Sequence, residues 1–142
     1  MPSPDDILNF LPWRYGDPQP DHRRIADYLQ AEVAADETIE RAAIAFVEHW
    51  DAVAILTATR LFIGYNKFFR CRIESFDLDD ITDLEDAVQD RIDLVVKAPG
   101  RRFHARLLRT PEGEAFHAAL VNRLRPTPSI TFTPFDARRK PK

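Results

Sequence analysis

The stretch Ile55-Leu56-Thr57-Ala58-Thr59-Arg60-Leu61-Phe62-Ile63 decides the fold. Apolar residues that favour β-strands run into a short polar corner and then into a second apolar run. This pattern predicts two strands, 53–57 and 61–65, joined by a tight turn. No side chain in the stretch has the surroundings of a catalytic group, so we expect its role to be architectural.

The polar side chains of the corner have a physical reason to be there. The hydroxyl groups of Thr57 and Thr59 can satisfy backbone groups at the junction between two strands. Arg60 lies at the mouth of the second strand, where it could bind a ligand or pair with a neighbouring carboxylate. Surface arginines commonly pair with carboxylates, so we favour the ion pair.

Length and composition are those of an ordinary soluble domain. The chain has 142 residues, of which 44% are hydrophobic and 30% charged, and its net charge of −3 argues against a polyanion-binding protein. No apolar run approaches the roughly 20 residues that span a bilayer. The acidic, proline-broken segment 1–6 does not resemble a secretory signal. We therefore expect a cytoplasmic protein.

Two helices are predicted, one before and one after a run of strands. The first covers residues 21–35 with Asp21 as its N-cap. Its apolar stripe consists of Ile25, Tyr28, Leu29 and Val33. The second begins after Thr110, with Pro111 at its first position. Its apolar residues recur every four positions, at Phe116, Leu120 and Leu124.

Between the helices, short apolar runs separated by turn residues predict seven strands. Their ranges are 42–49, 53–57, 61–65, 69–74, 82–84, 91–96 and 102–108, and the predicted turns include Trp50-Asp51, Asn66-Lys67 and 98–100. In the fourth strand, Phe69, Cys71 and Ile73 are expected to point inward. We divide the chain into an N-terminal arm (1–21), a folded domain (22–125) and a proline-rich basic tail (126–142).

Two segments carry a resemblance to a known family. Residues 54–63 read as an apolar strand, Leu-Thr, a small polar pair, Arg-Leu and a second apolar strand, and Phe76-Asp77-Leu78-Asp79-Asp80-Ile81 follows the fourth strand. Both segments, and the placement of the last helix, resemble small bacterial pleckstrin-homology (PH)-like domains of the YokE type. The resemblance covers about residues 25–125. It implies an α+β fold: a seven-stranded antiparallel barrel or sandwich, capped by a C-terminal helix and preceded by an N-terminal helical extension.

The residue types that carry enzyme chemistry are scattered. The four histidines have no ligand-like spacing, Cys71 is the only cysteine, and the acidic run 77–86 lacks the glycine and terminal glutamate of a calcium loop. No glycine-rich phosphate loop is present. We therefore expect no enzyme activity, no metal and no cofactor. Segment 65–72 interleaves aromatic and basic residues, but the acidic balance elsewhere argues against nucleic acid.

The PH-like topology implies that three turns lie together at one end of the sheet. They would form a basic and aromatic rim, which consists of Trp50, Lys67, Phe68, Phe69, Arg70, Lys97, Arg101 and Arg102. Such a rim suits acidic headgroups or phosphates, with the aromatic rings at a membrane interface. The alternative is that Trp50, Phe68 and Phe69 cap the open end of the core.

The leading functional interpretation is a non-enzymatic PH-like interaction module. Its partner would be a protein or an anionic membrane surface, and self-association through a sheet edge is left open. The alternative is a small-ligand-binding or catalytic domain that uses the aromatic and basic residues as a pocket. A deep, closed pocket lined by Trp50, Phe68 and Tyr65 would favour that alternative, whereas a convex rim would favour surface binding.

Overall fold

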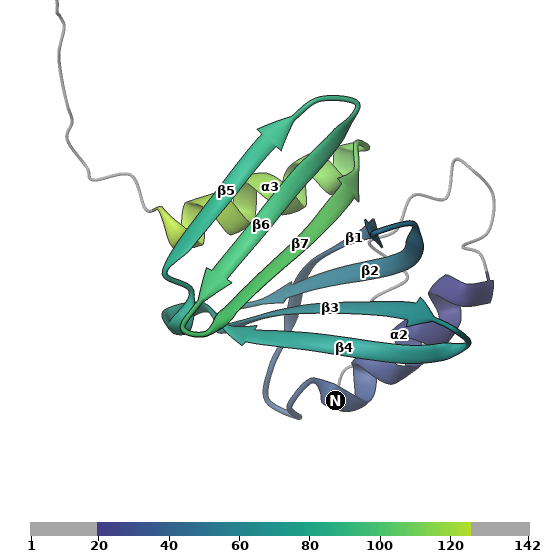
Figure 1. Cartoon of the computed structure of the whole chain (residues 1–142). Helices are drawn as coiled ribbons and strands as arrows, with labels where there is room; N and C mark the ends of the chain where they lie inside the picture. The colour runs from purple at the N-terminus through teal and green to yellow at the C-terminus, as the bar shows by residue number, and fades with distance from the viewer. Residues whose placement is uncertain (1–19, 126–142) are drawn as a thin grey trace, which may run out of the picture.

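The computed structural model describes residues 20–125, in which seven strands lie between two helices (Figure 1). In chain order the elements are α2 (Pro20–Glu32), β1 (Ile39–Val47), β2 (Trp50–Thr57), β3 (Arg60–Lys67), β4 (Arg70–Asp77), the 3-10 turn η2 (Leu78–Asp80), β5 (Asp83–Val88), β6 (Arg91–Ala98), β7 (Arg101–Leu108) and α3 (Pro111–Leu124). The predicted α+β class is confirmed. The helix start expected near Ser3 and the basic tail lie outside the described residues.

All seven strands belong to one antiparallel sheet in the order β4-β3-β2-β1-β7-β6-β5. The pairing of β1 with β2 runs from end to end, whereas β1 meets β7 only where Ala45 and Phe46 lie opposite Leu107 and Arg106. The sheet folds over at this short joint, so that β5–β7 cross β1–β4 at a steep angle (Figure 1). This is the predicted sandwich.

Two separate apolar cores lie on the two faces of β1–β4. The inner core fills the space between the two halves of the sheet and is closed by α3, with Phe116 and Leu120 fully buried. The outer core lies under α2, where Ile25 and Leu29 are fully buried. Gly64 permits this helix to approach closely, since a Cβ atom there would lie 2.8 Å from Cγ2 of Ile25.

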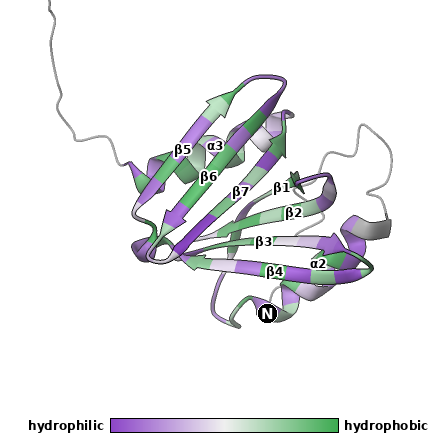
Figure 2. Cartoon of the chain, viewed as in Figure 1, coloured by the Kyte–Doolittle hydropathy of each residue, from purple (hydrophilic) through white to green (hydrophobic). Residues whose placement is uncertain are grey.

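The stretch that decides the fold supplies both cores. Leu56 and Leu61 face the inner core, whereas Ile55 and Phe62 face the outer core, and all four are fully buried. Strands buried on both faces need apolar residues at successive positions, which explains why this stretch does not alternate. By contrast, Figure 2 shows alternating hydrophobic and hydrophilic bands along β6, whose outer face is not covered by a described element.

Both helix predictions hold apart from their ends. Helix α2 begins at Pro20, so that Asp21 lies inside its first turn, and it ends at Glu32. Tyr28 belongs to the predicted apolar stripe but is 48% exposed. Helix α3 begins as expected, because the Thr110 hydroxyl accepts a hydrogen bond of 3.1 Å from the Gly113 N–H.

All seven predicted strands are present, but several turns lie elsewhere. The first turn is Glu48-His49 and Trp50 begins β2, so the predicted Trp50-Asp51 corner is wrong. The turn predicted at Asn66-Lys67 lies two residues later, at Phe68-Phe69. Phe69 therefore belongs to a turn and does not point inward. No helix in residues 20–125 is long and apolar enough to cross a membrane.

Candidate functional site

Two hairpin turns, β1–β2 and β3–β4, meet at one end of the sheet. They are joined by Trp50, whose ring centroid lies 4.5 Å from that of His49 and 5.1 Å from that of Phe68. The Phe68 ring meets the Trp50 ring edge-on, the arrangement that aromatic pairs favour. We call the four residues Lys67, Phe68, Phe69 and Arg70 the hairpin tip.

The backbone of the hairpin tip has an unusual conformation. Phe68 and Phe69 are the two central residues of the turn, with φ angles of 53° and 65°. A two-residue turn with positive φ at both positions matches the twist of a hairpin, but it favours Asn-Gly, because larger side chains are strained there. Two phenylalanines in succession at such positions therefore cost stability, of order 1–3 kcal/mol each.

The strain is not repaid by packing. Phe68 is 67% exposed and Phe69 is 91% exposed. The expectation that the aromatic residues cap the core therefore fits only Trp50, which is partly buried and packs against the inner core. Strained, exposed aromatic residues at the end of a rigid hairpin are a candidate binding site.

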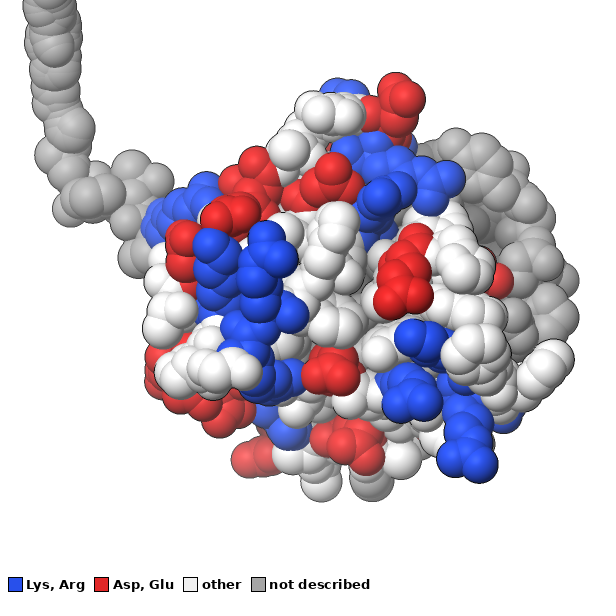
Figure 3. Space-filling view, viewed as in Figure 1, with Lys and Arg blue, Asp and Glu red and all other residues white. Residues whose placement is uncertain are grey.

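The charge around the hairpin tip is mainly positive. Lys67 lies 3.8 Å from the Glu48 carboxylate and 5.9 Å from the Phe68 ring centroid. Arg70 and Arg72 are exposed and form no ion pair with another described residue. Figure 3 shows Lys and Arg side chains gathered at the lower right, over the β3–β4 hairpin.

Beside the hairpin tip lies a surface recess of about 400 Å³. Its walls combine aromatic and polar side chains from α2, β2, β3 and both turns: Arg24, His49, Trp50, Asp51, Asn66, Phe68 and Phe69. Arg24 holds the turn in place, since its Nη2 donates a hydrogen bond of 2.9 Å to the Phe69 carbonyl. Tyr65, expected in the wall of a closed pocket, instead lies in the inner core, 6.1 Å from Phe103 between ring centroids.

The third turn of the predicted rim lies elsewhere. Arg101 donates hydrogen bonds to the Ser75 carbonyl (2.9 Å) and the Glu74 carboxylate (2.7 Å), which places the β6–β7 turn beside the end of β4 (Figure 1). Lys97 pairs with Glu85 on the outer face of the same half of the sheet, and Arg102 is its cross-strand neighbour. The rim prediction assumed that all three turns share one end. The steep crossing of the two halves separates the third from the other two.

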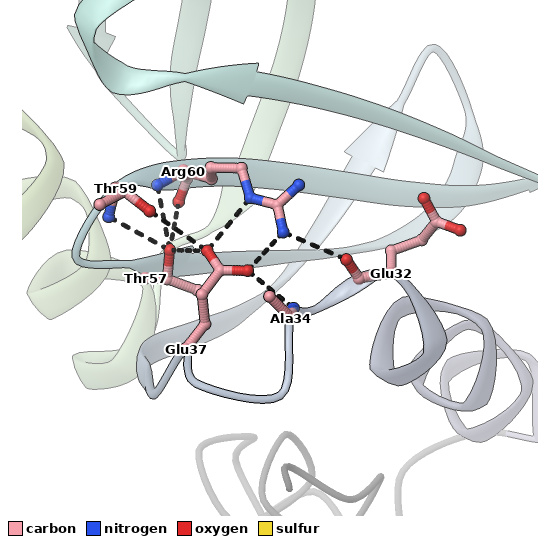
Figure 4. Close-up of polar contacts among 6 residues, drawn as sticks. All are labelled: Glu32, Ala34, Glu37, Thr57, Thr59 and Arg60. Carbon is pink, nitrogen blue, oxygen red and sulfur yellow. Dashed lines mark hydrogen bonds and ion pairs between the residues drawn. The ribbon is translucent and has the colours of Figure 1, made fainter.

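A polar network at the opposite end fixes the corner between β2 and β3 (Figure 4). Arg60 forms an ion pair with Glu37, and its Nε donates a 3.1 Å hydrogen bond to Oε2 of that carboxylate. The hydroxyl groups of Thr57 and Thr59 donate to the same oxygen at 2.9 and 3.2 Å. The Arg60 guanidinium is the main reason that the pKa of Glu37 falls to about 2. The predicted structural ion pair is confirmed.

Two further groups of interest are structural. The pKa of Asp86 is lowered, first by its 2.7 Å hydrogen bond to His117 and then by Arg125, which together join α3 to β5. Burial raises the pKa of the Cys71 thiol, which packs against the outer core. Within residues 20–125 no three His, Cys, Asp or Glu side chains are grouped to hold a metal ion.

Comparison with known proteins identifies the class of fold. No family model matches the sequence, and no curated protein matches it. Among solved structures, a DUF1696 family protein with a pleckstrin-homology domain from Shewanella loihica PV-4 is similar at a TM-score of 0.51 and 16% identity, covering 71% of this chain and 94% of that one. The hSac2 domain of the human phosphoinositide phosphatase Sac2 is similar at a TM-score of 0.47 and 12% identity, covering 69% and 74%.

The fold is therefore that of the PH-like class, with seven antiparallel strands, a C-terminal helix and, here, an additional N-terminal helix on the outer face. At 16% identity the similarity establishes the fold alone. The hairpin tip is the candidate binding site in residues 20–125 because its two phenylalanines are both strained and exposed.

Proposed function

We propose that this protein is a non-enzymatic PH-like interaction module that docks its hairpin tip on an anionic membrane surface. The observation that carries the proposal is the pair Phe68-Phe69, exposed and held at positive φ between Lys67 and Arg70. Aromatic rings settle at the level of lipid headgroups, and neighbouring cations are attracted to anionic lipids. We also propose that the protein is cytoplasmic and that it is a bacterial PH-like domain of the YokE type.

The magnitudes make the expected binding weak and reversible. Burial of a phenylalanine side chain contributes about 1.5–3 kcal/mol, and a cation near an anionic surface about 1 kcal/mol. Because Lys67 is already paired with Glu48, we count one cation, Arg70, which forms no ion pair with another residue in 20–125. The sum for one tip is about 4–7 kcal/mol, equivalent to dissociation constants of about 1 mM to 10 μM.

One observation favours a partner protein as the second candidate. Trp50 and Asn66 line the recess, and each has one buried polar atom, Nε1 and Oδ1, without a hydrogen-bond partner among the described residues. If binding opens the recess to these two atoms, a main-chain amide of a protein segment that enters beside Phe68 would supply both partners. The small-ligand or catalytic alternative has no comparable support, since the predicted Tyr65 wall is not part of the recess.

Cosedimentation with vesicles tests the membrane proposal. We expect the protein to pellet with phosphatidylserine-containing vesicles and not with phosphatidylcholine alone. Phe68→Asn with Phe69→Gly should reduce this binding by at least about tenfold, because both rings are removed. Lys67→Ala with Arg70→Ala should reduce it and weaken its salt dependence.

The matched control removes two positive charges away from the tip, by Arg41→Ala, opposite Leu56 near the β2–β3 corner, with Arg109→Ala, beside the β5–β6 turn. This variant should bind vesicles almost as the wild type does. Equal loss in the control and tip variants, or no vesicle binding at all, would contradict the membrane proposal. A protein captured by the wild type and lost with the Phe68 and Phe69 changes, without vesicle binding, would support the second candidate.

A further inference from the structure

Strand β4 has an open outer edge. In the described part of the chain it pairs only with β3. The Ser75 carbonyl accepts a hydrogen bond from the Arg101 side chain, so it points away from β3. Along an antiparallel strand, successive residues point their backbone N–H and C=O groups alternately toward the neighbouring strand and away from it. The N–H and C=O groups of Cys71, Ile73 and Ser75 therefore all face outward, away from β3. An edge of this kind can pair with another strand.

The side chains along this edge are complementary to themselves. On one face of β4, Arg70 and Arg72 occupy the first half and Glu74 the second, while Asp77 lies at the end of the other face. Figure 3 shows this division, with positive side chains over the hairpin end of β4 and a negative group toward its other end. A strand that is positive in one half and negative in the other matches an antiparallel copy of itself.

One register satisfies both the backbone and the charges. With a two-fold axis at Ile73, Cys71 of one copy lies opposite Ser75 of the other, so outward-facing groups meet outward-facing groups. Arg72 of each copy then lies opposite Glu74 of the second copy, twice by symmetry. Opposite charges at directly facing positions stabilise a pair of strands, and like charges destabilise it.

Helix α2 adds an apolar contact at the same level. The helix runs beside β4 and in the same direction. Near the start of α2, Arg24 donates a hydrogen bond to the Phe69 carbonyl, just before β4 begins. At the end of α2, the Glu32 carbonyl accepts a hydrogen bond from Arg60, which lies opposite the last residue of β4, Asp77. Tyr28 follows Arg24 by one helical turn and so lies on the β4 side. At 48% exposure it is available to meet its counterpart across the axis.

Arg101 competes for this edge. In the single copy it binds both Glu74 and the Ser75 carbonyl, at 2.7 and 2.9 Å. Both groups are needed for the pairing described above. Arg101 therefore sets the balance between an isolated and a paired β4.

We propose that β4 pairs antiparallel with β4 of a second copy of this chain, about a two-fold axis at Ile73, and that Arg101 opposes the pairing. The two hairpin tips then lie at opposite ends of the joined sheet. Self-association rests on an edge of the sheet and is measured without lipid, so its failure and the failure of membrane docking are distinguishable.

Sedimentation velocity of the full chain tests the proposal. Protein concentrations up to about 1 mM are needed, because an interface made by one pair of short edge strands is small and weak. We expect a concentration-dependent dimer. Arg72→Glu alone and Glu74→Arg alone should each weaken it by about 10- to 30-fold, because each places like charges opposite one another. The double variant R72E/E74R should restore it. Arg101→Ala should strengthen it.

The control is Arg41→Glu, which makes the same change of charge as Arg72→Glu but lies on β1, three strands away from the β4 edge, and should leave the dimer unchanged. Circular dichroism of each variant shows that it is folded. A wild type and an Arg101→Ala variant that both remain monomeric, or a double variant that does not recover dimerisation, would overturn the proposal.

Discussion

Glu37 connects three parts of the chain through one carboxylate. Its oxygens accept hydrogen bonds from the Arg60 guanidinium, from two threonine hydroxyls and, at 2.8 Å, from the Ala34 N–H (Figure 4). The connection between α2 and β1 is thereby fixed to the β2–β3 corner. An ionised carboxylate with this many donors is strongly favoured over the protonated form.

The stability of the protein should fall at acid pH because of Glu37. The folded pKa of Glu37 is about 2, below the ordinary value of 4.5, so its contribution to stability is complete above about pH 4.5 and is lost as pH falls toward 2. The difference corresponds to about 3 kcal/mol as an upper figure. Urea unfolding of the wild type at pH 7 and pH 3 should show the loss, and Glu37→Gln should lower stability at pH 7 and flatten the pH dependence.

The control for this experiment is Glu85→Gln. Glu85 also has a lowered pKa, because of its hydrogen bond to Lys97, but its side chain is 52% exposed. Exposed pairs of this kind contribute little. Equal effects of the two substitutions on the pH dependence would show that the Glu37 network does not hold the corner.

At the scale of elements, the sequence predicts where the strands lie better than where the hairpin turns lie. All seven strands and the cap at Thr110 follow from apolar runs and local hydrogen-bonding chemistry. The sequence predicts the turn two residues too early, at Asn66-Lys67, since phenylalanine is an unfavoured residue at positive φ and no Gly or Asn marks Phe68-Phe69. The sequence also predicts the tip residues as a site, but only the structure shows their strain.

Replacing the tip by residues suited to its backbone should separate stability from binding. Phe68→Asn with Phe69→Gly relieves two positive-φ residues and removes little packing, so we expect stability to rise by about 2–6 kcal/mol, less the contact between Phe68 and Trp50. The midpoint of urea unfolding measures this gain. The same variant should lose vesicle binding.

Gly100 supplies the reverse control. Its φ is +72° and an added Cβ would meet no atom within 4 Å, so only backbone strain changes in Gly100→Ala. This variant should be less stable by about 1 kcal/mol. A tip variant that is destabilised while Gly100→Ala behaves as expected would mean that the two phenylalanines stabilise the fold.

At the scale of the whole molecule, β1–β4 separate two apolar cores. The apolar stripe of α2 predicts an amphipathic helix, but nothing local in it says which face of the sheet the helix covers. For the same reason the sequence did not reveal the steep crossing that moves Arg101 to the end of β4. Both features depend on contacts between residues far apart in the chain.

Leu120→Ala should cost about 2–5 kcal/mol, because this fully buried side chain of α3 closes the inner core. Leu29→Ala is the matched substitution in the outer core and should cost a similar amount. Urea unfolding of both variants, followed by tryptophan fluorescence and by circular dichroism, should show one shared transition. Near-neutral stability of Leu120→Ala would contradict the role assigned to α3.

The separation of the cores has a consequence for synthesis on the ribosome. Once the nascent chain has emerged as far as Asp77, α2 and β1–β4 are available and the outer core can form. The opposite face of those strands, with Leu56, Leu61 and Phe76, stays incompletely covered until β5–β7 and α3 have emerged. A half-finished protein thus displays an apolar face that is completely covered only after residues 78–124, from Leu78 to the end of α3 at Leu124, have been made. During that interval we expect chaperones to engage it.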